Sequence, residues 1–205
     1  EELMPLRSRA YPVVIGMDFG RTPAAILKQR DWKGRVLTLD EVTSDNMALT
    51  TFLTRHLIPF ISQAKYRDCS FVVCGDPAGW AQSQLREENA GAILRAAGFT
   101  ENGPAPTNTI DRRLEATEKL LLQQIEGKAT YLISPTCTKL LQGFRGKYAY
   151  KAKRDGGYEV TPLKNAWSHP MDANGYADLV INAGLQGVRA PRAVEVEAVS
   201  MRGWT

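Results

Sequence analysis

The sequence predicts a mixed α/β fold, in which helices flank a central sheet and a further β-hairpin follows toward the C-terminal side. Three observations predict it. An apolar run at residues 13–19 contains an aspartate near its end, strand-like and helix-like periodicities alternate along the chain, and glycine-containing turns separate them. The 205 residues suffice for one large core, and 43% hydrophobic and 23% charged residues are typical of globular proteins. We therefore exclude disordered and fibrous classes.

Composition excludes further classes. No apolar run approaches the roughly 18 residues that span a bilayer, and the start Glu1-Glu2-Leu3 does not resemble a signal peptide, so we expect no membrane partner. Cys69, Cys74 and Cys137 match no common zinc spacing and are expected to be reduced thiols. The net charge of +4 permits a polyanionic partner without requiring one.

The chain is interpreted as a fragment of a longer polypeptide, because it lacks an initiator methionine and enters a strand early. We expect residues 1–185 to form the folded domain. Residues 186–205 show only weak periodicity and are expected to form a flexible tail.

The first half of the chain is expected to build most of the sheet. Strands are predicted at residues 13–19, 24–29, 35–42 and 70–75. Short loops with glycine and aspartate predict that the first three form an antiparallel meander. A helix with capping candidates Ser44 and Asp45 reaches about Phe60 before the fourth strand, which is expected to be buried and parallel.

The second half is mainly helical. Helices are predicted at residues 82–97, from Asp111 as the cap to Gly127, for one turn at 139–141, and from the Pro170 turn to about Ala183. Residues 103–106 are expected to form a loop and residues 130–134 a short extended run. The segments 148–153 and 158–161 flank a glycine turn and predict the hairpin.

Three acidic residues stand at the ends of these elements. Asp18 lies at the end of the first strand, Asp76 follows the fourth, and Asp172 is placed in the first turn of the last helix. The order of elements is that of an RNase H-like core, in which the two strands are neighbours and their aspartates meet at one edge of the sheet. Carboxylates are hard ligands for Mg²⁺ or Mn²⁺, and two such ions can clamp the attacking and leaving oxygens of a phosphodiester.

Three stretches, in this order, carry a resemblance to a known family: Ile15–Gly20, Cys74–Gly79 and Ser168–Ala173. They resemble the nuclease domain of the large terminase subunit of tailed bacteriophages, over the chain from about Val13 to Ala183. Supporting stretches run from Asn108 to Arg113, from Leu140 to Tyr148, and over Lys164-Asn165.

The resemblance implies a metal-dependent endonuclease that cuts concatemeric double-stranded DNA during genome packaging, in the host cytoplasm and not in the mature virion. It implies Asp18, Asp76 and Asp172 as the catalytic triad of a two-metal Mg²⁺ or Mn²⁺ site, with Asp18 shared by both ions. It also implies an N-terminal ATPase domain in the parent protein, a small terminase subunit and a portal as partners. This chain has no GxxxxGK[ST] loop, so the motor is expected to be absent from it.

Each aspartate also has an ordinary structural interpretation. Asp76 before Pro77 is typical of a turn, and Asp172 can complement a helix dipole. A buried Asp18 without a ligand would be costly, which favours a ligand role. Asp178, six residues after Asp172, lies well round the helix from it and is predicted to be a surface residue.

Three further residues are possible auxiliaries. His169 could orient a ligand or protonate a leaving oxygen, although helix capping by Ser168 and His169 is an equal alternative. Lys164 could contact a scissile phosphate or be an ordinary loop lysine. Glu41, with Asp40, ends the third strand and is kept as a possible extra ligand.

The hairpin region carries the strongest signal for DNA binding. Residues 145–164 contain six basic and two acidic side chains, which gives this segment a net charge of +4. The predicted DNA-binding residues are Arg145, Lys147, Lys151, Lys153 and Arg154. Tyrosines alternate with these basic residues, which suggests that one face of the hairpin contacts DNA phosphates and the other packs on the core. DNA binding of this kind depends on salt and not on base sequence. An edge hairpin protected by lysines is the alternative.

Three other functions stay open. One is another RNase H-like nuclease, such as a junction resolvase or a recombinase core. Another is a non-catalytic packaging module that binds DNA or the portal, with structural carboxylates. The last is an ATP-binding fold of the actin and sugar-kinase type, ranked lowest because its second phosphate-binding glycine loop is not evident.

Overall fold

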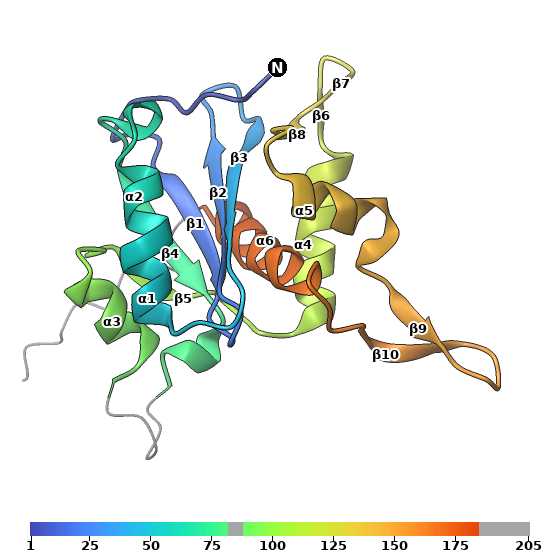
Figure 1. Cartoon of the computed structure of the whole chain (residues 1–205). Coiled ribbons are helices and arrows are strands. Elements are labelled where there is room, and N and C mark those ends of the chain that lie inside the picture. Colours follow the sequence, from blue (N-terminus) through green and yellow to red (C-terminus); the bar gives the residue numbers. More distant parts are fainter. Residues whose placement is uncertain (82–87, 185–205) are drawn as a thin grey trace, which may run out of the picture.

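The computed structural model describes residues 1–81 and 88–184, and a mixed sheet forms its centre (Figure 1). Its strands are β1 (Val13–Asp18), β2 (Ala24–Arg30), β3 (Val36–Thr43), β4 (Phe71–Gly75), β5 (Asn102–Pro104) and β8 (Tyr131–Ile133), in the spatial order β5-β4-β1-β2-β3-β8. β1, β2 and β3 form the predicted antiparallel meander. β4 pairs parallel with β1, β5 with β4, and β8 with β3. The predicted mixed sheet with a parallel fourth strand is confirmed.

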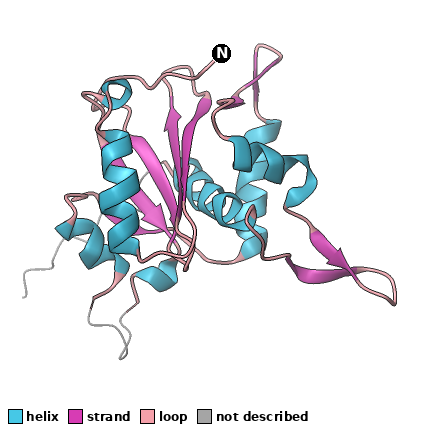
Figure 2. Ribbon diagram, in the orientation of Figure 1, coloured by secondary structure: helices cyan, strands magenta, loops and turns pink. Residues whose placement is uncertain are grey.

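Helices cover both faces of this sheet (Figure 2). One face carries α1 (Leu49–Phe52), α2 (Ile58–Ile61) and α3 (Ala90–Ala96), and the other carries α4 (Ile110–Leu122), α5 (Thr138–Gln142) and α6 (Ser168–Asn182). The alternation of β1 explains the division, because successive side chains of a strand point to opposite faces. Val13, Ile15 and Met17 pack under the first layer, whereas Val14 packs under α6.

The first helical segment begins later than the sequence suggests. Ser44 does not cap it, because its hydroxyl donates to the Pro23 carbonyl at 2.8 Å beside β2. The helix starts at Leu49, and a π-helical turn at Leu53–Leu57 joins α1 to α2. Pro59 in α2 has no N–H to donate to the preceding turn, which accounts for the local change of helix type. A 3₁₀ turn at Ala64–Tyr66 leads on toward β4.

Other boundaries also differ from the prediction. α3 begins at Ala90, where the Asn89 side chain accepts from the Ala92 N–H, and Gly98 with φ +95° follows its end as expected. Part of the helix predicted at 82–97 and the tail predicted at 186–205 lie outside the described residues. The predicted loop at 103–106 is wrong in part, because β5 pairs with β4 there.

The ends of α4 are corrected as well. Thr109 is its N-cap, so Asp111 lies inside the first turn. α4 stops at Leu122, short of Gly127, because the chain turns into the small ladder of β6 (Gln124–Ile125) and β7 (Lys128–Ala129). Among residues 1–81 and 88–184, no helix has both the length and the apolarity needed to cross a membrane.

α6 lies directly on β1 because Gly16 leaves room for it. A Cβ at Gly16 would stand 2.2 Å from the Ala173 carbonyl oxygen and 2.8 Å from the Ala177 Cβ. No larger side chain allows this approach. The close contact brings the first turns of α6 to the end of β1.

The predicted hairpin is present and extends away from the domain (Figure 1). α5 continues into a π-helical turn at Gly143–Lys147, and the hairpin follows as β9 (Tyr150–Ala152) and β10 (Tyr158–Pro162). The idea that one hairpin face meets the core is wrong, since residues 151–161 are all exposed, Tyr158 included.

Candidate active site

Asp18 and Asp76 leave the same end of two neighbouring strands. β1 and β4 run parallel, with Met17 opposite Gly75. The residue that follows each of these positions is an aspartate, Asp18 after Met17 and Asp76 after Gly75. Alternation directs both toward the α6 side, because Cys74, two residues before Asp76, packs under α6. The backbone thus places the two aspartates at the same edge of the sheet, as expected from the sequence.

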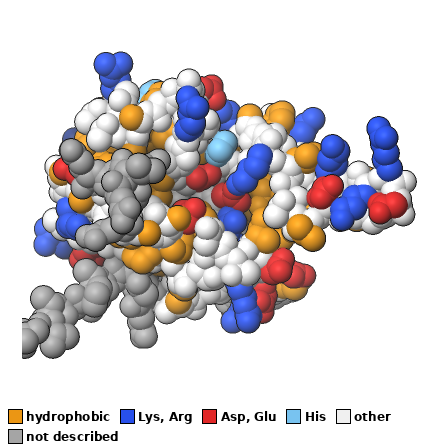
Figure 3. Space-filling view, turned by 90° about the horizontal axis from the view of Figure 1, so that it is seen from below, with side chains coloured by type: hydrophobic (Ala, Val, Ile, Leu, Met, Phe, Trp, Pro, Cys, Tyr) orange, Lys and Arg blue, Asp and Glu red, His pale blue; other side chains and the backbone are white. Residues whose placement is uncertain are grey.

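The carboxylate of Asp18 connects β1 to the start of α6. Its Oδ1 accepts the Gly20 N–H at 3.1 Å, and its Oδ2 lies 2.9 Å from His169 Nδ1. Figure 3 shows acidic side chains beside a histidine in the middle of the face seen from below. His169 therefore contacts Asp18 directly. At the start of α6, Asn165 Oδ1 accepts from the Trp167 and Ser168 N–H groups at 3.0 Å, and the Ser168 hydroxyl accepts the Asn165 N–H at 3.2 Å. Ser168 therefore takes part in capping, as the alternative predicts, whereas the His169 ring contacts Asp18.

Asp76 also has a local structural role. Its Oδ1 accepts the Ala78 N–H at 2.9 Å and so caps the 3₁₀ turn Pro77–Gly79. The turn-forming interpretation is correct for this oxygen. It does not compete with a ligand role, because a carboxylate has two oxygens and about four lone pairs.

Asp172 is held by two cations. It is the fifth residue of α6 and not in its first turn, and its side chain is only 5% exposed. Oδ1 accepts from Arg113 Nη1 at 2.7 Å and from the Tyr148 hydroxyl at 3.1 Å, and Oδ2 accepts from Lys164 Nζ at 2.5 Å. Burial acts to raise the pKa of Asp172, but the hydrogen bonds and positive charges of Lys164 and Arg113 outweigh it and lower the pKa.

The Tyr176 ring shows that the three aspartates share one neighbourhood. Burial raises the pKa of this tyrosine, Arg113 opposes the rise, and the charges of Asp76, Asp172 and Asp18 all add to it. Yet across the described ranges no three His, Cys, Asp or Glu side chains lie close enough together to hold one ion. The three aspartates therefore all lie near Tyr176, but in the described structure they do not form a closed set of ligands.

The donor chemistry fits a hard divalent cation at Asp18 and Asp76. Carboxylate oxygens are the ligands that Mg²⁺ and Mn²⁺ prefer. Asp172 differs from Asp18 and Asp76, because the ammonium of Lys164 on its Oδ2 would compete with a metal ion for the same oxygen.

Glu41 is occupied elsewhere in the fold. Its Oε1 accepts the Lys139 N–H at 2.7 Å and its Oε2 accepts the Leu140 N–H at 2.8 Å, so the side chain caps α5. Its neighbour Asp40 is buried and binds Tyr66 at 2.6 Å and Lys65 at 2.5 Å. Both carboxylates thus hold helical segments against β3.

The prediction that Asp178 lies on the surface is wrong. Its side chain is fully buried and forms an ion pair with the equally buried Lys28 of β2. Its Oδ2 also accepts from the hydroxyls of Thr117 and Tyr131 at 2.8 and 3.0 Å and from Asn174 Nδ2 at 2.8 Å. Burial lowers the pKa of Lys28, and the opposing charge of Asp178 does not cancel the effect.

Arg113 was not predicted as a site residue, although it lies in a stretch that carries the resemblance. Its side chain packs between α4 and α6, with the guanidinium 4.7 Å from the Tyr176 ring centroid. A Cβ at Gly175 would meet the Arg113 Cβ at 3.0 Å. Nothing local in the sequence marks Arg113 as a partner of Asp172, because the two residues meet only where α4 packs on α6.

The five predicted DNA-binding side chains are solvent-exposed. Lys151, Lys153 and Arg154 lie on the extended hairpin, and Arg145 and Lys147 lie on the π-helical turn before it. Lys147 Nζ is 5.4 Å from the Trp167 ring centroid, beside the start of α6. A basic surface therefore extends outward from the helix that carries Asp172.

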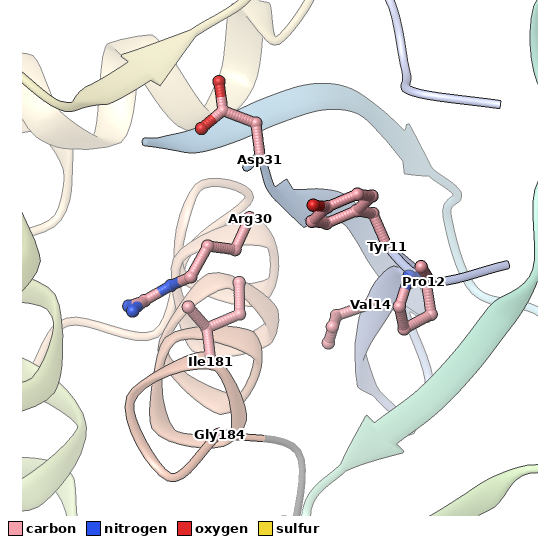
Figure 4. Close-up of a pocket in the computed structure, with 8 residues that line it drawn as sticks. Tyr11, Pro12, Val14, Arg30, Asp31, Ile181 and Gly184 are labelled. Atoms are coloured by element: carbon pink, nitrogen blue, oxygen red, sulfur yellow. The ribbon is translucent and has the colours of Figure 1, made fainter. Parts of the chain in front are cut away.

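Two cavities differ in their relation to the aspartates. One of about 300 Å³ lies beside Asp172, and its lining includes Arg113, Tyr148 and Lys164. Another of about 250 Å³ lies where β1 begins and α6 ends, with Tyr11, Arg30 and Ile181 around it (Figure 4). The strand and helix directions put this second cavity at the opposite end of the sheet from Asp18.

The three cysteines are free, as predicted. Cys74 and Cys137 are buried, and burial raises the pKa of Cys137 to about 12. Neither is a thiolate at neutral pH.

Solved structures share this fold. The chain is similar to the nuclease domain of g2p, the large terminase of bacteriophage SPP1, solved with bound Mn (19% identity, TM-score 0.53, 81% of this chain and 84% of that one). It is similar to the P22 large terminase nuclease domain (15%, TM-score 0.58, 92% and 88%). It also matches the large terminase of a thermophilic bacteriophage (18%, TM-score 0.59, 90% and 42%), of which it spans less than half.

The sequence comparisons add no relative. No family model matches the chain, and no curated protein matches it. The structural matches establish the RNase H-like α/β fold of large terminase nuclease domains, which is the fold the sequence predicts.

Proposed function

We propose that this chain is a divalent-metal-dependent DNA endonuclease domain, which cuts concatemeric double-stranded DNA during phage genome packaging. The observation that carries the proposal is the placement of Asp18 and Asp76 at the same end of adjacent parallel strands, with His169 on Asp18 and Asp172 on the facing helix. The fold it shares with terminase nuclease domains supports the same function, since that of SPP1 was solved with Mn and that of phage G20c with magnesium.

In this proposal Asp18, Asp76 and Asp172 hold two Mg²⁺ or Mn²⁺ ions, with Asp18 shared between them. The ions would activate water and stabilise charge on the phosphodiester oxygens. His169 fixes the rotamer of Asp18 through the 2.9 Å contact, and Arg113 fixes that of Asp172. The exposed basic side chains of the hairpin would bind backbone phosphates, which carry no sequence information.

The partners in this proposal are those of a packaging machine. An ATPase domain of the parent protein, a small terminase subunit and a portal would act with this domain in the host cytoplasm. The match to the large terminase of the thermophilic bacteriophage supports a longer parent, because this chain covers only 42% of that protein.

The test is cleavage of supercoiled plasmid by the purified chain with Mg²⁺ or Mn²⁺, beside EDTA. We expect nicking and linearisation with metal only, and loss of cleavage by at least about 10²-fold in Asp18→Asn, Asp76→Asn and Asp172→Asn. Glu118→Gln on the exposed surface of α4 is the matched control and should cut normally. Full cleavage by all three aspartate variants would refute the site.

One observation favours a non-catalytic packaging module instead. Both oxygens of Asp172 are already paired with cations, as structural carboxylates are. In that case the chain would bind DNA without cutting it in either metal, and Asp18→Asn would change only the free energy of unfolding. Preference for branched over linear duplex would instead indicate a junction resolvase.

A further inference from the structure

The two oxygens of Asp172 differ in what holds them. Oδ1 accepts from Arg113 and Tyr148, whereas in the described structure Lys164 is the one hydrogen-bond partner of Oδ2. Oδ2 is therefore the oxygen that becomes free if a single contact breaks. An ammonium and a divalent cation on the same oxygen repel each other, so each weakens the binding of the other.

The two cations also differ in mobility. Arg113 is 9% exposed and fixed between Gly175 and the Tyr176 ring. Lys164 is 72% exposed and lies in the connection between β10 and α6, on a flexible four-carbon stem. Lys164 can leave Asp172 by rotating its side chain alone, whereas Arg113 would have to disrupt helix packing.

The space next to this ion pair is suited to an anion. The lining of the cavity of about 300 Å³ includes Arg113, Lys164, Tyr148, Thr161 and Ser168. No carboxylate is among these lining residues, and they supply two cations and three hydroxyls. The basic hairpin begins at its rim, since Thr161 and Pro162 belong to β10.

We infer that Lys164 moves from Asp172 Oδ2 to a DNA backbone phosphate held in this cavity, and that metal binding at Asp172 is thereby coupled to DNA binding. The inference rests on the proposed function and adds its regulation. Without DNA the ammonium occupies the place of a cation on Asp172, and with DNA the phosphate takes the ammonium away. Because coupling free energies are reciprocal, metal must in turn favour DNA binding.

The first test measures Mn²⁺ affinity of the full chain without DNA, by isothermal titration calorimetry. Lys164→Gln removes the charge and keeps most of the side chain, so it should bind Mn²⁺ roughly tenfold or more tightly than wild type. Lys119→Gln, an exposed lysine of α4, is the matched control and should leave the affinity unchanged. Adding Asp172→Asn to Lys164→Gln should abolish the gain.

The second test measures DNA affinity without metal, by fluorescence anisotropy of a short labelled duplex in EDTA. Lys164→Gln should make one phosphate contact fewer than wild type, which reduces the slope of log K against log salt by about 0.9. Equal Mn²⁺ affinity of wild type and Lys164→Gln would overturn the inference while plasmid cleavage still supports the proposed function. Failure of both proteins to bind Mn²⁺ would overturn both.

Discussion

Lys28 of β2 and Asp178 of α6 form an ion pair in which both side chains are fully buried. Lys28 pairs across the ladder with Val14, on the sheet face that α6 covers, and its Nζ also donates to the Tyr131 hydroxyl. Thr117 of α4 reaches the same carboxylate. The ion pair and its hydrogen-bond partners thus connect β2, β8, α4 and α6. Asp178 lies six residues after Asp172 in α6.

Breaking this pair should destabilise the domain strongly. Asp178→Asn leaves a buried lysine without a counter-charge, and Lys28→Met leaves a buried carboxylate, so each should lower the free energy of unfolding by about 3–5 kcal/mol. The double variant removes both charges and should lose less than the sum of the two by about 2 kcal/mol. Urea denaturation of all four proteins measures this coupling. Strict additivity would show that the pair contributes no coupling.

Buried tyrosines should make the fold sensitive to alkaline pH. Burial and Asp40 raise the pKa of Tyr66, and burial and Asp178 raise that of Tyr131. An unfolded tyrosine ionises near pH 10. Above that pH the unfolded chain therefore binds fewer protons than the folded one, and stability, fully present below it, falls as pH rises.

Urea denaturation between about pH 8 and 11 tests this expectation, with absorbance of tyrosinate recorded in parallel. Tyr66→Phe should flatten the decline of the unfolding free energy above pH 10. Tyr158→Phe, at a hairpin position that is 68% exposed, should leave it unchanged. A decline of the same slope in Tyr66→Phe would contradict the assignment.

The sequence predicts the positions of Asp18 and Asp76 at the ends of β1 and β4, because strand alternation and strand ends are local properties. The same reasoning fails for Asp178. Asp178 does lie on another side of α6 from Asp172, as predicted. However, α6 is buried between the sheet and α4, so a residue on that other side is buried as well. Lys28, on the same face as Ala24 and Ile26, was the signal that a buried carboxylate was needed.

The remaining differences also have physical causes. β5 escapes prediction because its three residues contain glycine and proline, which mark loops, and only pairing with β4 makes them a strand. The cations on Asp172 could not be foreseen either. Arg113 and Lys164 are 59 and 8 residues away along the chain, and tertiary packing alone brings both to one carboxylate.

Gly16→Ala should loosen the contact between α6 and β1. The new methyl group would lie 2.2 Å from the Ala173 carbonyl oxygen, which belongs to helix backbone and cannot turn aside. We expect a loss of about 1–3 kcal/mol in unfolding free energy. Gly20→Ala is the control, since a Cβ there would meet nothing closer than Asp18 Oδ1 at 3.5 Å. Thermal denaturation measures the stability of both variants and of wild type. Equal stability of Gly16→Ala and Gly20→Ala would contradict the packing argument.

The hairpin should supply salt-dependent affinity for duplex DNA without supplying stability. Lys151, Lys153 and Arg154 are exposed, so their joint replacement by glutamine should leave the unfolding free energy unchanged. Each phosphate that the variant no longer neutralises should reduce the slope of log K against log salt by about 0.9. Anisotropy titrations in EDTA at several salt concentrations measure it, with Lys119→Gln as the control. A slope equal to that of wild type would mean that the lysines only protect a hairpin edge from pairing with other strands.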